Sequence, residues 1–377
     1  MKSEKPRNPI QFIRPNRDYH APPANLTVFH ALQKVRSKKL VQVLLDNCSI
    51  QRMERIYEYA DSKKREATKE DVKLFGLAPL LELLENAPIV ISASGLCEMP
   101  GGKVGKAHRA YERFCAQFWP THSDDKAATH HAVQKESIEK KVNFNELDND
   151  ARRGYGLAYL AFMHYQQIYR CFGKLSPEKK FEAYLYGMIE YIDVLSAFEL
   201  EVVKYLFWDP SPKVLEGLPM STRKRKQLIK RNFGGAGTRI EKCRELAFDR
   251  AMDVNWLIMG NISEDNGNDI DVFGERFGIE CWIGTTDEKL FDICKDIHST
   301  PGPDSSMNTL VVDREEEMSE LPYWRYVDGL AKDVLFQRNS GEKTRARTFD
   351  YLPRIDAALS DIERNLIRKF DTIHCSI

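Results

Sequence analysis

Short apolar segments that end beside acidic residues constrain the fold of this chain more than any other feature. The first is Val41-Gln42-Val43-Leu44-Leu45-Asp46-Asn47, a β-branched and leucine run that closes on a carboxylate. A run of this kind is typical of a strand buried on both faces of a parallel sheet. We therefore predict a central parallel strand with Asp46 at its carboxyl end. Asp46 also suits the N-cap of the helix predicted to follow it.

Two further segments repeat this arrangement. Residues 89–94 read IVISAS and predict a second buried strand, with Glu98 just beyond its end. Residues 280–290 read ECWIGTTDEKL and predict a short buried strand, a polar turn and the start of a helix, with Asp287 at the junction. Open α/β folds place their sites at this edge of the sheet. The alternatives are a solvated loop acid for Glu98 and a helix cap for Asp287.

One more acid, the third of the four in chain order, is expected on a helix over residues 240–260. Its carboxylates recur every four residues and share one face, namely Glu241, Glu245, Asp249 and Asp253. Like charges at this spacing cost about 0.2–0.5 kcal/mol per pair. A divalent cation near Asp253 would offset part of that cost, with Asp249 as the alternative acid.

The chain has no net charge to attract nucleic acid as a whole, since 56 basic residues balance 56 acidic ones. A local patch is possible in residues 221–231, STRKRKQLIKR, which hold basic side chains and no acid. Lysine and arginine bind the phosphates of nucleic acid, and binding is favoured because it releases counterions. The alternative is a helix face that is only solvated. The predicted phosphate contacts are Arg223, Lys224, Arg225, Lys226, Lys230 and Arg231.

Other patterns bear on compartment and architecture. Eight cysteines form no CxxC pair, the charged start MKSEKPRNP has no apolar segment, and no apolar run approaches the roughly 20 residues of a membrane span. We therefore expect a cytoplasmic protein that does not enter a membrane.

Residues 151–208 are helical in pattern and rich in aromatics, which predicts a helical hairpin with an aromatic core. Residues 353–370 predict a helix that packs against the rest of the protein.

The order of the four acidic motifs resembles that of the PIN-domain nucleases. In that family an early strand ends in Asp, as in VLLDN here, and a second acid follows the next strand, as in SASGLCE. The third lies on a helix, as in RAMDVNWL, and the fourth follows a threonine at a strand end, as in GTTDEKL. The resemblance implies an α/β fold, a PIN-like parallel sheet flanked by helices, here interrupted by a mainly helical insertion.

The resemblance also implies a function. Asp46, Glu98, Asp253 and Asp287 would hold Mg²⁺ or Mn²⁺, which prefer oxygen ligands, and Asn47 and Thr285 would support these ligands. The protein would hydrolyse phosphodiester bonds, in RNA rather than DNA. The alternatives are a catalytically inactive PIN-like protein that binds nucleic acid or a regulatory partner, and a helical interaction protein whose acids are caps and surface charges. An inhibitory protein partner and an oligomer are both compatible with the sequence.

These expectations divide the chain into five parts. They are an arm with a short helix (1–38), the first part of the PIN-like core (39–102), the helical insertion with the basic stretch (103–238), the second part of the core (239–315) and a C-terminal helical extension (316–377).

Overall fold

The computed structural model groups the chain into two compact units. Unit 1 is Met1–Val142 with Trp256–Ser299, and unit 2 is Asn143–Asn255 with Thr300–Ile377. Within them the structure describes residues 6–15, 25–99, 101–119, 143–194, 196–265, 267, 269–272, 274–294, 297–301, 308–340 and 351–374, and for some of these, Glu98 among them, only the backbone. Helix α12 (Ile240–Asp265) and strand β6 (Ile297–Pro301) cross the boundary between the units.

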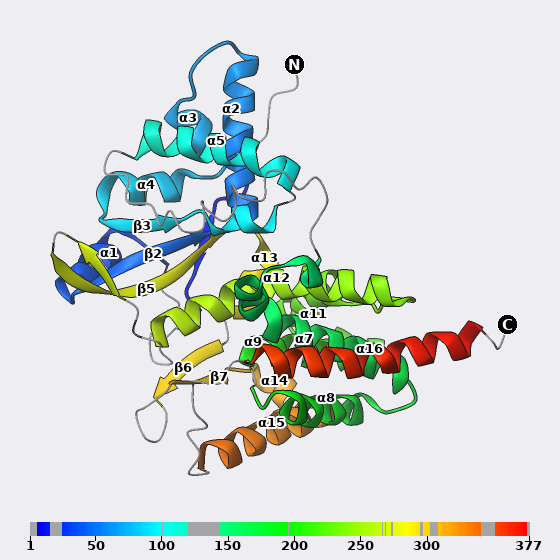
Figure 1. Ribbon diagram of the computed structural model, residues 1–377. Coiled ribbons are helices and arrows are strands. Elements are labelled where there is room, and N and C mark those ends of the chain that lie inside the picture. Colours follow the sequence, from blue (N-terminus) through cyan, green and yellow to red (C-terminus); the bar gives the residue numbers. More distant parts are fainter. Residues whose placement is uncertain are drawn as a thin grey trace. The chain divides into compact units, whose positions relative to one another are not determined.

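Unit 1 is built on a mixed, open five-stranded sheet (Figure 1). Its strands are β1 (Gln11–Ile13), β2 (Lys39–Leu45), β3 (Ile89–Ser92), β4 (Asp269–Val272) and β5 (Glu275–Thr285). The order is β1-β5-β2-β3, with β4 also paired to β5. Strand β2 runs parallel to β3 and β5, whereas β1 and β4 are antiparallel to β5. The α/β class is confirmed, but the sheet is mixed rather than wholly parallel.

The parallel centre of the sheet consists of the three apolar segments identified in the sequence. In β2, Val41, Val43 and Leu45 are fully buried, and they face a core that also holds Trp282 of β5. The helices over this core are α2 (Asn47–Ser62), α3 (Lys69–Leu74), α4 (Ala78–Asn86) and α5 (Gly101–Phe118), all on one side of the sheet in Figure 1. Burial of both faces explains why these strands are continuous apolar runs rather than alternating ones.

Two further helices, a turn and the second half of α12 also belong to unit 1. Helix α1 (Val28–Arg36) precedes β2, the 3₁₀ turn η1 (Ser94–Glu98) follows β3, and α13 (Glu288–Cys294) follows β5. The second half of α12 approaches β5, since a Cβ built on Gly260 would lie 3.7 Å from the Cβ of Cys281. The chain from 69 to 86 forms two helices, α3 and α4, because Gly76 adopts a φ of 77° just after α3.

A buried carboxylate ties β5 to its neighbours in unit 1. Glu280 is fully buried and receives hydrogen bonds or ion pairs from His30 (2.5 Å), Lys34 (2.6 Å), the Trp282 indole (2.9 Å) and, at 3.5 Å, the Arg14 guanidinium. Burial alone would raise the pKa of Glu280, but these donors outweigh it and lower the pKa to about 2. A buried charge is tolerated only when it is paired in this way.

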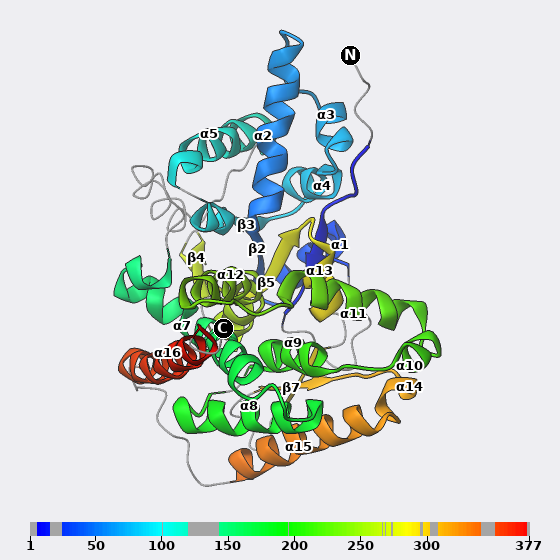
Figure 2. The ribbon, with the colours of Figure 1, turned by 90° about the vertical axis from the view of Figure 1, so that its right-hand side faces the viewer.

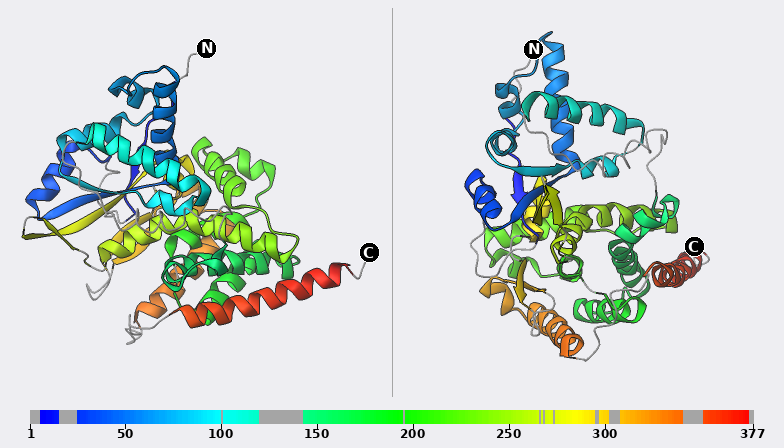
Figure 3. Two further views of the ribbon diagram at one scale, coloured as in Figure 1. Left: turned by 45° about the horizontal axis from the view of Figure 1, so that its top comes forward. Right: turned by 60° about the vertical axis from the view of Figure 1, so that its left-hand side comes forward.

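Unit 2 is mainly helical. Its elements are η2 (Phe144–Glu146), α7 (Asn149–Cys171), α8 (Pro177–Tyr191), α9 (Ala197–Phe207), α10 (Pro212–Glu216), α11 (Met220–Phe233), β7 (Asn308–Val312), α14 (Glu316–Ser319), α15 (Pro322–Ser340) and α16 (Leu352–His374). Helix α16 lies along α7, as the red and green helices show in Figures 2 and 3. The expected hairpin over 151–208 is three helices, because Ser196 caps a third helix, α9. Strand β7 pairs with β6 in a separate two-stranded sheet.

The interior of unit 2 combines aromatic packing with one buried ion cluster. Arg314 donates to both oxygens of Glu201, at 2.9 Å each, and also pairs with Asp328. Its guanidinium lies 3.9 Å from the ring centroid of Trp324, and Lys204 reaches Asp328 at 2.8 Å. The planar fork of arginine fits a carboxylate and an aromatic face together, which a lysine cannot do.

The two units divide the chain differently from the five expected parts. Helix α5, expected in the insertion, packs in the core of unit 1, whereas residues 239–255 and 300–315 belong to unit 2. The helices within the described ranges include none that is both long and apolar enough to cross a membrane.

Candidate functional site

Asp46 lies at the junction of β2 and α2, where the sequence places it. It is the N-cap of α2, and its Oδ1 accepts the backbone amide of Ser49 at 2.8 Å. Its Oδ2 accepts the hydroxyl of Thr285. The side chain is only 4% exposed. The capping role is therefore present, but a cap alone requires neither burial nor a second donor from another strand.

Thr285 connects the ends of two parallel strands. The β2–β5 register pairs Leu45 with Gly284, so the next residues, Asp46 and Thr285, emerge at the same edge of the sheet. The Thr285 hydroxyl donates to Asp46 and its oxygen accepts the backbone amide of Asp287 at 2.8 Å. One buried hydroxyl thus holds the segments that carry the first and last acids of the motif series.

Ser49 adds a second hydrogen bond across the same edge. Its hydroxyl donates to the carbonyl oxygen of Gly284 at 2.8 Å, and the residue is fully buried. A serine two residues after Asn47, on the first turn of a helix, gives no signal in sequence that its hydroxyl reaches another strand.

The electrostatics of Asp46 differ from those of an ordinary cap. Burial raises its pKa from 3.8 to about 6, and the charge of Asp287 acts in the same direction. The hydrogen bonds from Thr285 and Ser49 oppose this rise without cancelling it. The carboxylate is therefore ionised at neutral pH at a cost, which a nearby cation would reduce.

The turn η1 brings the backbone of the second motif against this junction. A Cβ on Gly95 would lie 2.2 Å from the backbone nitrogen of Asn47 and 2.3 Å from the carbonyl carbon of Asp46. Only glycine permits such an approach. Glu98 ends this turn, but its side chain lies outside the described part of the structure. The Asn47 amide oxygen accepts a hydrogen bond from Gln51 at 2.7 Å.

The predicted third acid belongs to the other unit. Asp253 and its alternative Asp249 lie on α12 within unit 2, and both are half-buried. The structure thus brings together Asp46, Thr285 and Asp287 within unit 1. Among the described residues, no group of three or more His, Cys, Asp and Glu side chains is arranged to hold a metal ion.

The basic stretch forms α11 of unit 2 and divides into two faces. Arg225 is buried and donates to the Tyr205 hydroxyl and to Glu315, at 3.1 Å each. Lys226 is buried and donates to the backbone oxygens of Tyr205, at 2.6 Å, and Trp208. Burial lowers the pKa of Lys226 to about 8. These two side chains are internal, whereas Lys224, Lys230 and Arg231 are exposed and Arg223 is half-buried.

Comparisons of the chain with protein-family models, with curated protein sequences and with solved structures gave no match.

Proposed function

We propose that this protein is a metal-dependent nuclease of PIN-like architecture that hydrolyses phosphodiester bonds in RNA. The observation that carries the proposal is the hydroxyl of Thr285, which bonds to the Asp46 carboxylate and to the amide of Asp287. It places two acids at the carboxyl edge of neighbouring parallel strands, where α/β folds build their sites. The order of the acidic motifs, with a threonine before the last acid, supports the same assignment.

The carboxylates of Asp46 and Asp287 are the kind of oxygen ligand that a hard divalent cation prefers. Mg²⁺ and Mn²⁺ accept one or two carboxylates and keep several waters, so Asp46 and Asp287 supply enough charge by themselves. Glu98, which ends η1 in the same unit, is assigned to complete the set, and Asp253, which lies in unit 2, is left out of it. A bound cation would supply the Lewis acidity that makes a water nucleophilic near neutral pH. Within the protein, Thr285 and Ser49 fix the direction of the Asp46 oxygens.

The surface side of α11 is assigned to the phosphate backbone. Lys224, Lys230 and Arg231 are exposed on it, and phosphate contacts require no particular base sequence. Arg225 and Lys226 are assigned a supporting role instead, because they hold α11 against α9 through Tyr205.

Cleavage of single-stranded RNA in the presence of Mn²⁺ tests the proposal. Wild-type protein is compared with Asp287→Asn and with Glu70→Gln, which neutralises an exposed acid on α3. We expect cleavage by wild type and Glu70→Gln and about a hundredfold slower cleavage by Asp287→Asn, since even groups that only support a metal ligand contribute about 10–100-fold to metal affinity or activity. Equal cleavage by all three proteins would remove Asp287 from the site. A single-stranded DNA substrate of the same sequence tests the preference for RNA.

A second candidate is a catalytically inactive PIN-like protein that binds nucleic acid or a regulatory partner. It is favoured by the absence, among the described residues, of a group of three or more possible metal ligands. Thermal unfolding separates the two candidates, since a ligand that binds only the folded state stabilises it. A working site gains stability from Mn²⁺ and loses that gain in Asp287→Asn, whereas an inactive one is unaffected by either change.

A further inference from the structure

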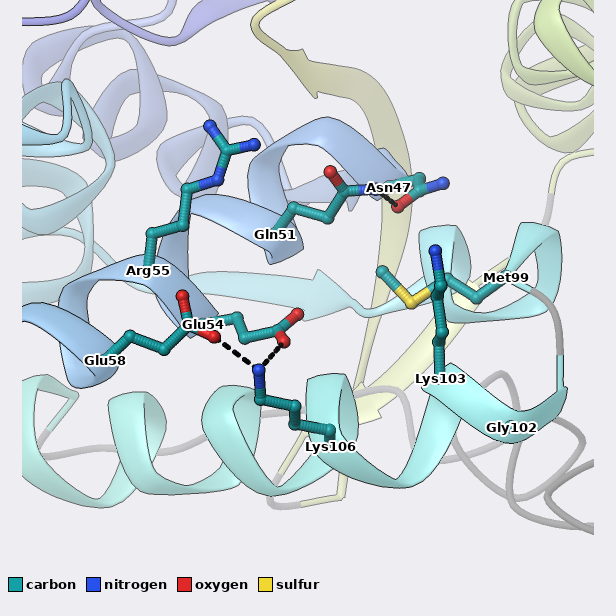
Figure 4. Close-up of a pocket in the computed structure, with 9 residues that line it drawn as sticks. All are labelled: Asn47, Gln51, Glu54, Arg55, Glu58, Met99, Gly102, Lys103 and Lys106. Atoms are coloured by element: carbon teal, nitrogen blue, oxygen red, sulfur yellow. Dashed lines mark hydrogen bonds and ion pairs between the residues drawn. The ribbon is translucent and has the colours of Figure 1, made fainter.

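A pocket of about 390 Å³ opens directly beside the candidate site in unit 1. Helix α2 lines one side of it, beginning with Asn47, the residue after Asp46. Met99 and α5 line the other side, with Lys103 and Lys106 (Figure 4). Ligand pockets in proteins have volumes of about 300–1,000 Å³, so this one has room for a single nucleotide but for little more.

Some of the charged side chains around the pocket form ion pairs with one another and others do not. Lys106 pairs with both carboxylates of the lining, Glu54 at 2.6 Å and Glu58 (Figure 4). The exposed side chains of Arg55 and Lys103 form no ion pair or hydrogen bond with any residue that the structure describes. The lining has three cationic and two acidic side chains, so the pocket carries a small excess of positive charge, and Arg55 and Lys103 have no ionic partner among the described residues.

The other lining groups fit the remainder of a nucleotide. Asn47 uses its amide oxygen to accept from Gln51, which leaves its NH₂ group able to donate to a ligand oxygen. The thioether of Met99 adds an apolar and adaptable surface. Cations for a phosphate, an amide for a hydroxyl or base edge and an apolar contact are thus found within one small cavity.

We propose that the α2–α5 pocket, lined by Arg55, Lys103, Asn47 and Met99, is a nucleotide subsite for single-stranded RNA, which seats the nucleotide next to the bond that is cut. Arg55, on α2, and Lys103, on α5, lie on opposite sides of the pocket (Figure 4), and each contacts a phosphate of the bound strand. This subsite rests on the proposed nuclease function, because the position of Asn47 directly after Asp46 is what places the nucleotide beside the reacting phosphodiester.

Binding of a labelled single-stranded RNA hexamer, measured by fluorescence anisotropy over a range of salt concentrations, tests the subsite without requiring cleavage. The full-length protein carries Asp287→Asn so that the RNA stays intact, and Arg55→Ala and Lys103→Ala are added singly. Lys73→Ala on α3 is the matched control, because it removes an exposed lysine that does not line the pocket. Arg55, Lys103 and Lys73 are exposed positions on helices, so folding of each variant is checked by circular dichroism.

We expect Arg55→Ala and Lys103→Ala each to weaken binding by about tenfold and to lower the slope of log K against log salt by about 0.7, the value for one lost phosphate contact on a single strand. Lys73→Ala is expected to change neither quantity. Equal affinities and slopes for all proteins would overturn the subsite.

The cleavage assay distinguishes this failure from failure of the nuclease proposal. Wild-type cleavage that persists in Lys103→Ala with an unchanged KM would remove the subsite and leave the nuclease. Lysine-dependent binding with no cleavage by wild type would remove the nuclease and leave an RNA-binding pocket.

Discussion

Replacing Asp46 with asparagine separates its role as a helix cap from its role as a buried charge. Asparagine and aspartate are about equally good N-caps, so the substitution keeps the bond from Ser49 and removes the charge. The pKa of Asp46 rises from 3.8 to about 6 on folding because of burial. A carboxyl whose folded pKa is raised stabilises the fold below its unfolded pKa, and this contribution is lost as the pH rises through the folded value.

The size of the effect follows from the two pKa values. At about 1.4 kcal/mol for each tenfold change, the rise from 3.8 to about 6 costs the wild-type protein about 3 kcal/mol at pH 8. Part of this free-energy cost is already present at pH 4, because pH 4 lies just above the unfolded pKa of 3.8. We therefore expect the stability of Asp46→Asn relative to wild type to increase by about 2–3 kcal/mol between pH 4 and pH 8.

Hydrogen exchange of peptides from β2 and β5 is the suitable assay, because it reports local opening of unit 1 in a chain of two units. Asp46→Ala serves as the control, since it removes the charge and also the cap, which costs about 0.5–2 kcal/mol at every pH. If the difference in opening free energy between wild type and Asp46→Asn stays constant from pH 4 to pH 8, Asp46 is not a buried charge that costs stability.

Three further substitutions test other parts of the structure. Gly95→Ala is expected to destabilise unit 1 by about 2–3 kcal/mol, because its Cβ would overlap the backbone of Asn47, and unchanged exchange in α2 peptides would contradict that contact. Glu280→Gln is expected to cost about 3–5 kcal/mol at pH 7, since Lys34 and Arg14 lose the carboxylate that they share in the interior. This cost shrinks as the pH falls from 4.5 towards 2, where wild-type Glu280 itself becomes protonated, and a gap that is the same at pH 3 and pH 7 would exclude the charge as its cause. Arg314→Lys is expected to cost unit 2 about 2–3 kcal/mol through loss of the forked bond to Glu201, measured by exchange in α9 and α15, and native protection there would show that the fork is dispensable.

The central strands were predictable because their signal is local. A run such as VQVLL can be buried only as a strand or a short helix segment, and the carboxylate at its end marks where the chain leaves the core. Strands β1 and β4 gave no comparable signal. Gln11–Ile13 is three residues long between prolines, and β4 is ordered by its pairing with β5. The antiparallel edge of the sheet is therefore a tertiary effect.

The site was predictable in part for the same reason. Asp46 and Thr285 come together because parallel strands in register end at one edge, a consequence that follows once both strands are recognised. The burial of Arg225 and Lys226 was not foreseen from the basic composition of the stretch. Their positions, three residues before Leu228 and Ile229, put them on the inner face of the helix, and helical spacing could have shown it.

Direct measurement of Mn²⁺ binding tests the central claim, that Asp46 and Asp287 form one cation site. The free Mn²⁺ signal in electron paramagnetic resonance falls as the ion binds, so titration of wild type, Asp287→Asn and Glu70→Gln gives the number and affinity of sites. We expect saturable binding by wild type and by Glu70→Gln, and affinity at least tenfold weaker in Asp287→Asn, where one of the two ligand charges is lost. Identical titrations for wild type and Asp287→Asn would contradict the account.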